Sequence, residues 1–165
     1  LLQTAGYARA VLAALLPHHA SRAIEKLVDL RMERQRALDR ANPVQLQVVL
    51  DESVLLRAAG GPEVMREQLE VLAERGRKPN VDLRVLPFDA GLDRAHLGEF
   101  VLLGFADEAL SDVVYVEGPS GESYLDTPAD VELYEHVFGE VADRALDPAA
   151  SLDRIESHLR SLERT

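Results

Sequence analysis

Apolar residues recur at helical spacing in two segments at the start of the chain. Thr4 is suited to cap the first segment, and Pro17 ends it. Ser21 is suited to cap the second, which ends near Asn42-Pro43 because a residue that precedes proline disfavours the helical conformation. The apolar positions are Tyr7, Ala8, Val11, Leu12, Leu15 and Leu16 in the first segment and Ile24, Leu27, Val28, Leu30 and Leu38 in the second. Residues 1–43 are therefore predicted to form a helical N-terminal part.

The next part of the chain predicts a strand, a helix and a second strand. Residues 46–50 read Leu-Gln-Val-Val-Leu, a run of residues that favour strands. Gly60-Gly61 interrupts the chain, and Pro62 fits the first turn of a helix that continues to about residue 75. Residues 81–87 then alternate between apolar and polar side chains, as a strand with one buried face does. A strand, a helix and a strand in this order predict two parallel neighbours.

The remaining pattern predicts three more strands and two helices. Residues 100–105 are predicted to form a strand, and residues 113–116 and 123–125 a hairpin around the turn at 118–121. One helix is predicted from Pro128 to about residue 145, and another, capped by Ser151, to about residue 162. The fold class is therefore α/β: N-terminal helices followed by a mixed sheet of about five strands with flanking helices, in a single domain over residues 1–165.

Composition and charge narrow the possible functions. The chain of 165 residues is 47% hydrophobic, which is enough for a core, and its net charge is −11. Because phosphate neutralisation provides most of the affinity for DNA, such an acidic chain is not expected to hold DNA by itself. The lack of cysteine excludes disulfides and thiolate zinc sites and favours a cytoplasmic location. No cofactor, metal or membrane association is expected.

The negative charge is unevenly distributed along the sequence. Residues 1–43 hold 7 basic and 4 acidic residues, which gives +3 and leaves −14 for residues 44–165. The helical pattern also begins directly at Leu1, which is not a methionine, so a further segment is expected upstream.

Several sequence blocks together resemble one family. They include Leu-Leu-Gln-Thr-x-x-Tyr-Ala-Arg-Ala at the start, Arg-Met-Glu-Arg-Gln at 31–35, Val-Val-Leu-Asp-Glu at 48–52 and Gly-Gly-Pro-Glu-Val-Met-Arg-Glu-Gln-Leu at 60–69. Asn-Val at 80–81, Val-Leu-Pro-Phe at 85–88 and Asp-Val-Val-Tyr-Val-Glu at 112–117 continue the series. In this order the blocks resemble the C-terminal domain of unknown function attached to Scr-type, antitoxin-like helix-turn-helix (XRE) regulators of actinobacteria.

This resemblance implies a role in transcription regulation. It implies a DNA-binding domain upstream of Leu1 and a small acidic partner protein, in a toxin-antitoxin-like arrangement. We therefore expect a regulatory domain that binds such a partner or a small-molecule effector, supports a homodimer and has no enzymatic activity.

A second resemblance concerns the fold. The strand at 81–87, a loop containing His96, the strands at 100–105 and 113–116 and a closing helix are similar to one half of a phospholipase D-like phosphodiesterase. That family has a His-x-Lys pair, whereas here His96 is followed by Leu97, Gly98 and Glu99. The lysine is absent and a nearby carboxylate would repel phosphate, so a phosphodiester hydrolase, degenerate or active, is the alternative function.

The best candidate for a binding site joins the second helix to the end of the first strand. Arg34 shares a helix face with Leu27 and Leu30, so its guanidinium is expected to find a carboxylate. Asp51 or Glu52 is the expected partner, at the carboxyl end of the first strand, where open α/β sheets place ligand crevices. The pairing of Arg31 or Arg34 with Glu52 is therefore the best candidate. The candidate ligand- or partner-binding residues are Arg31, Arg34, Glu52 and His96. A structural ion pair and, for His96, a surface position are the alternatives.

Overall fold

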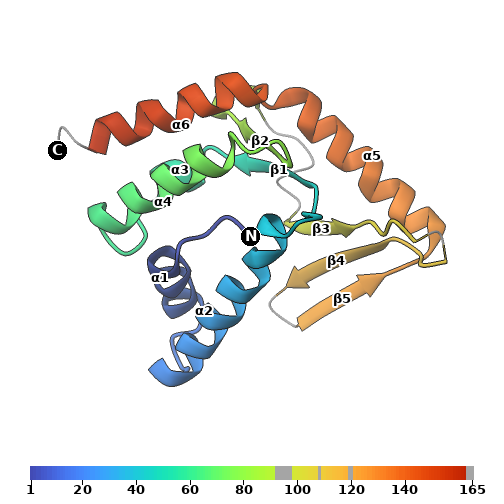
Figure 1. Cartoon of the computed structure of the whole chain (residues 1–165), viewed down its shortest axis with the longest axis horizontal. Helices are drawn as coiled ribbons and strands as arrows, with labels where there is room; N and C mark the ends of the chain where they lie inside the picture. The colour runs from blue at the N-terminus through green and yellow to red at the C-terminus, as the bar shows by residue number, and fades with distance from the viewer. Residues whose placement is uncertain (92–97, 108, 119–120, 163–165) are drawn as a thin grey trace. The chain divides into compact units, whose positions relative to one another are not determined.

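The structure is a computed structural model that describes residues 1–91, 98–107, 109–118 and 121–162 (Figure 1). The chain divides into two compact units, each with its own sheet. Unit 1 comprises residues 1–88 together with 146–165, and unit 2 comprises residues 89–145. The chain therefore leaves unit 1 once and returns to it with its last helix.

The elements of unit 1 are two N-terminal helices, a β-α-β segment and the last helix. They are α1 (Ala5–Leu15), α2 (Ser21–Gln35), the 3-10 turn η1 (Arg36–Asp39), β1 (Leu46–Asp51), α3 (Ser53–Leu56), α4 (Pro62–Arg75), β2 (Val81–Leu86) and α6 (Pro148–Leu162). After the 3-10 turn η2 (Phe88–Ala90), unit 2 contains β3 (Phe100–Leu103), β4 (Val113–Gly118), β5 (Gly121–Leu125) and α5 (Pro128–Arg144).

The two strands of unit 1 are parallel and are joined by α4. Their register runs from Leu46 opposite Val81 to Asp51 opposite Leu86. Gly61 lies directly before α4 with φ 94°, a conformation that glycine adopts without steric cost, and Pro62 opens the helix. The carboxyl ends of β1 and β2 therefore lie side by side, at the edge where Asp51 gives way to Glu52.

The last helix, α6, packs on β2 and α4, and it begins one turn earlier than the sequence pattern predicts. Asp147, and not Ser151, caps it, since the Asp147 carboxylate accepts a hydrogen bond from the Ala150 N–H at 2.8 Å. Ser151 instead lies fully buried inside the helix, where its hydroxyl accepts the Val85 N–H at 2.9 Å. The neighbouring Leu146 N–H donates to the Val85 carbonyl at 2.9 Å. The N-terminal end of α6 therefore provides hydrogen-bond partners for both the N–H and the carbonyl of Val85.

The N-terminal helices α1 and α2 pack against each other through Ala8, Leu12, Ile24 and Val28. The main core of unit 1 lies around the two strands, and α1 contacts α4 but not this sheet among its principal contacts.

Unit 2 is an antiparallel three-stranded sheet in the order β3-β4-β5, with α5 against β3 and β4. Thr127 caps α5, as its hydroxyl oxygen accepts the Asp130 N–H at 3.2 Å. The ring of Tyr134 on α5 lies edge-on to Phe100, with 4.9 Å between the ring centroids. One face of this sheet is therefore covered by the helix that follows it.

The sequence predictions of an α/β class and of the order of strands and helices along the chain are confirmed. The prediction of one mixed sheet is wrong, since the parallel pair and the antiparallel meander form separate sheets. The second helix also ends earlier than predicted, at Gln35, and continues only as a 3-10 turn.

Replacing Ser151 by alanine is expected to leave the Val85 N–H buried without a partner. An unsatisfied buried donor costs about 1–3 kcal/mol, so Ser151→Ala should lower the free energy of unfolding by that amount in urea titrations. Ser157→Ala, at an exposed position of the same helix, is the matched control. Equal stability of the two variants would contradict the structural role of Ser151.

Candidate functional site

Among the predicted site residues that the structure describes, Glu52 is the one that lies buried in a cluster of charged and polar groups. Its side chain is only 7% exposed, and three donors surround it. Oε1 accepts from the Arg154 Nη1 at 2.5 Å and lies 3.3 Å from His158 Nε2, while Oε2 accepts from the Phe88 N–H at 3.0 Å. The carboxylate therefore joins the end of β1, the end of β2 and the helix α6. We call Glu52, Arg154 and His158 the Glu52 cluster.

The electrostatics of this cluster favour the charged form of Glu52. Burial by itself would raise the pKa of Glu52, but the hydrogen bonds from Arg154, the Phe88 N–H and His158 outweigh it and lower the pKa. A carboxylate with a lowered pKa and occupied oxygens is a poor general base. The arrangement is best suited to hold α6 against the ends of the two strands.

The predicted pairing of Arg31 or Arg34 with Glu52 is wrong. Arg31 donates to the side-chain oxygen of Gln3 at 2.5 Å, and Arg34 is exposed on α2. The error arises because α6, which follows Glu52 by about a hundred residues, brings its own arginine to the carboxylate first. His96 lies outside the described residues, and the phosphodiesterase resemblance that depends on it stays a prediction.

Arg31 instead belongs to a set of polar contacts that hold the segment before α1. The amide of Gln68, buried on α4, accepts the Thr4 N–H at 2.7 Å and donates to the Leu2 carbonyl at 2.8 Å. From α2, the side-chain amide of Gln35 donates to the Gln3 carbonyl at 2.6 Å. The segment that leads into α1 is thus fixed to two helices by side-chain hydrogen bonds. We call it the leading segment, residues 2–4.

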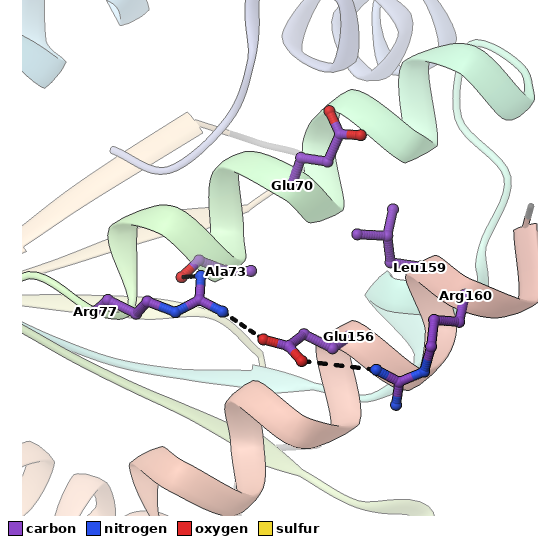
Figure 2. Close-up of a pocket in the computed structure, with 6 residues that line it drawn as sticks. All are labelled: Glu70, Ala73, Arg77, Glu156, Leu159 and Arg160. Atoms are coloured by element: carbon purple, nitrogen blue, oxygen red, sulfur yellow. Dashed lines mark hydrogen bonds and ion pairs between the residues drawn. The ribbon is translucent and has the colours of Figure 1, made fainter.

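A hollow of about 300 Å³ lies between α4 and α6 (Figure 2). It is lined by Glu70, Ala73, Arg77, Glu156, Leu159 and Arg160. Leu159 points from α6 toward α4. Arg77, Glu156 and Arg160 lie next to one another, whereas Glu70 stands apart from them on α4 (Figure 2). The hollow therefore combines an apolar wall with charged side chains at its rim.

Two arginines share one carboxylate at this rim. Arg77 forms an ion pair with Glu156 and donates to the Ala73 carbonyl at 2.8 Å. Arg160 lies 3.6 Å from the other oxygen of Glu156 (Figure 2). Because half-exposed ion pairs contribute little stability, an incoming anion can replace Glu156 beside these arginines at small cost. The carboxylate of Glu156 already occupies the position between the two arginines.

The helix α6 carries parts of both features. Arg154 and His158 lie one turn apart on the side that meets Glu52, and Glu156 and Arg160 lie one turn apart on the side that lines the hollow. These residues were not predicted from the sequence, where only the apolar positions of the last helix stand out. One signal was available in the sequence. Ser151 shares a helix face with Ile155 and Leu159, and a polar residue on an apolar face indicates that its side chain is buried and needs a hydrogen-bond partner.

The described ranges contain no group of three or more histidine, aspartate or glutamate residues that could hold a metal ion. No helix in those same ranges is both long and apolar enough to cross a membrane. The family model for a domain of unknown function, DUF5753, matches residues 1–157. No curated protein and no solved structure matches the chain.

The stability contributed by Glu52 is expected to depend on pH. The pKa of Glu52 is lower in the folded protein than the ordinary value of 4.5. Its contribution is therefore complete above pH 4.5 and is lost as the pH falls through the folded pKa. At neutral pH, Glu52→Gln should be destabilised by about 2 kcal/mol, less than for a fully buried pair because Arg154 is 36% exposed.

Urea unfolding of both proteins over a pH series measures this difference, with Glu74→Gln as a control for the loss of an exposed carboxylate in the same unit. The gap between wild type and Glu52→Gln should narrow on acidification. A gap that stays constant from neutral to acidic pH would show that the charge of Glu52 is not what stabilises the fold.

Proposed function

The chain belongs to the DUF5753 family, and we propose that it is the regulatory part of a helix-turn-helix transcriptional regulator in an antitoxin-like system. In this role the chain lies in the cytoplasm, catalyses no reaction and supports a homodimer. DNA is held by a separate helix-turn-helix domain, since a net charge of −11 is unsuited to phosphate contacts. The chain itself binds an effector or a partner protein, and this binding changes the activity of the DNA-binding domain.

The observation that carries the proposal is the double role of α6. One side of the helix lines the hollow through Glu156, Leu159 and Arg160, and another provides the two side-chain partners of Glu52. A ligand that moves α6 would therefore strain the part-buried ion pair between Arg154 and Glu52. Binding at an exposed hollow can in this way change the stability of the strand ends.

The proposed ligand carries an anionic group. It replaces Glu156 beside Arg77 and Arg160 and places an apolar part on Ala73 and Leu159. Both candidate sources have this chemistry: a small anionic effector, or a carboxylate of a small acidic partner protein. The charge of the unit is compatible with either, since unit 1 contains 16 basic and 15 acidic residues, a net +1.

The proposed output passes through the leading segment. An upstream DNA-binding domain would be joined to residues 2–4, which Gln68 on α4 and Arg31 and Gln35 on α2 hold. Because α4 also forms one wall of the hollow, the ligand and the leading segment contact the same helix. Arg31 is thus proposed to position the junction and not to bind ligand.

The proposal is tested with the full-length regulator, its promoter DNA and a transcriptional reporter. Removing this chain should leave DNA binding by the helix-turn-helix domain detectable but abolish dimerisation and the change in transcription on induction. Arg160→Ala should weaken that change by about tenfold in inducer concentration, because an exposed arginine of the hollow is lost. Arg22→Ala, an exposed arginine on α2, is the matched control.

A regulator that responds normally without this chain would contradict the proposed role. A response that Arg160→Ala and Arg22→Ala affect equally would contradict the assignment of the hollow, while the role of the chain as a whole would stand.

A further inference from the structure

The sheet of unit 2 has one face that α5 does not cover. Val101 of β3, Tyr115 of β4 and Tyr124 of β5 are directly opposite one another, and residues opposite in an antiparallel pair project to the same side. Phe100, which contacts Tyr134 of α5, projects to the other side. These three residues, with Leu103 and Val113 in the next row, form what we call the open face.

The open face is apolar and accessible. Val101 is 49% exposed, Leu103 is 42% exposed and Tyr124 is 60% exposed, while Val113 and Tyr115 are partly buried. The rings of Tyr115 and Tyr124 lie 5.2 Å apart between centroids. Contiguous apolar and aromatic side chains on a sheet surface are typical of protein interaction sites, where tyrosine is enriched.

The third row of the same face is acidic. Glu117 and Glu122 are directly opposite each other, one row beyond the tyrosines. Like charges in opposite positions destabilise a strand pair. The Tyr115 hydroxyl lies 3.3 Å from a carboxylate oxygen of each, but it has a single proton to donate. A cation placed here would relieve the repulsion that the hydroxyl can only partly offset.

The net charge of unit 2 also favours a basic partner. Residues 89–145 contain 14 acidic and 2 basic residues, a net −12, so the chain's entire negative charge of −11 resides in unit 2. A field of one sign favours and accelerates the approach of partners of the opposite sign and repels acidic ones. An acidic partner is therefore disfavoured on this unit.

We propose that the open face of unit 2 binds a basic polypeptide segment of a partner protein. Lysine or arginine side chains of the segment lie beside Glu117 and Glu122, and its apolar side chains pack on Val101, Tyr115 and Tyr124. The inference adds for unit 2 a partner of opposite charge to the ligand proposed for the hollow, and it rests on the interaction role proposed above. It concerns unit 2 alone and is independent of the hollow in unit 1.

The test uses the whole chain and two synthetic peptides, one alternating lysine with valine and one alternating glutamate with valine. Fluorescence anisotropy at low salt should detect binding of the lysine peptide only. The Glu117→Gln/Glu122→Gln double variant should weaken binding about tenfold, since two charge contacts are lost. The control Glu132→Gln/Glu135→Gln removes the same charge from exposed positions of α5 and should leave binding within about twofold.

Tyr124→Ala separates the apolar contribution from the charge contribution, because Tyr124 is exposed and its loss leaves the core unchanged. It should weaken binding at least about fivefold. Circular dichroism of each variant verifies the fold.

Three outcomes would overturn the inference: no binding of the lysine peptide at low salt, equal loss in the two glutamate double variants, or binding that Tyr124→Ala leaves unchanged. Self-association of the chain that Tyr124→Ala abolishes would also overturn it, since a second copy would then occupy the open face. In each case a full-length regulator that still needs this chain for its response would leave the proposed function intact.

Discussion

A buried carboxylate constrains how unit 1 is assembled. Glu52 follows β1 at a position where its side chain is almost inaccessible to water, and an unpaired charge there would cost several kcal/mol. Three donors from distant parts of the chain meet this requirement: Arg154, His158 and the Phe88 N–H. The last helix must therefore lie across the strand ends, because only there do its polar side chains reach Glu52.

This constraint also places the points at which the chain passes between its two units. The chain leaves unit 1 after Phe88, whose N–H is held by Glu52, and returns at Leu146, whose N–H is held by Val85. The anionic-ligand site proposed for the hollow uses the opposite side of the same helix. The two units also differ in charge, at +1 and −12, so the two proposed binding surfaces favour partners of opposite sign.

Local pattern predicted the elements, whereas the contacts between distant elements could not be predicted. Periodicity predicted β1, α4 and β2 and their parallel order, and Thr4 was the expected cap of α1. The predicted partner of Glu52 was wrong because arginines of two helices, Arg31 and Arg34 of α2 and Arg154 of α6, could each lie at the end of a strand. The spacing of these residues in the sequence does not decide between them. Ser151 was taken for a cap although its place on the apolar stripe of α6 indicated burial. The division into two sheets likewise depends on tertiary packing.

Hydrogen exchange at single amides tests most directly whether Glu52 holds α6 in place. Glu52→Gln is expected to accelerate exchange of the Phe88 N–H, of the Val85 N–H held by Ser151 and of the amides of α6, while the amides of α1 keep their wild-type rates. Unchanged exchange of Val85 and α6 in that variant would contradict the claim that the Glu52 cluster fixes the last helix to the strand ends.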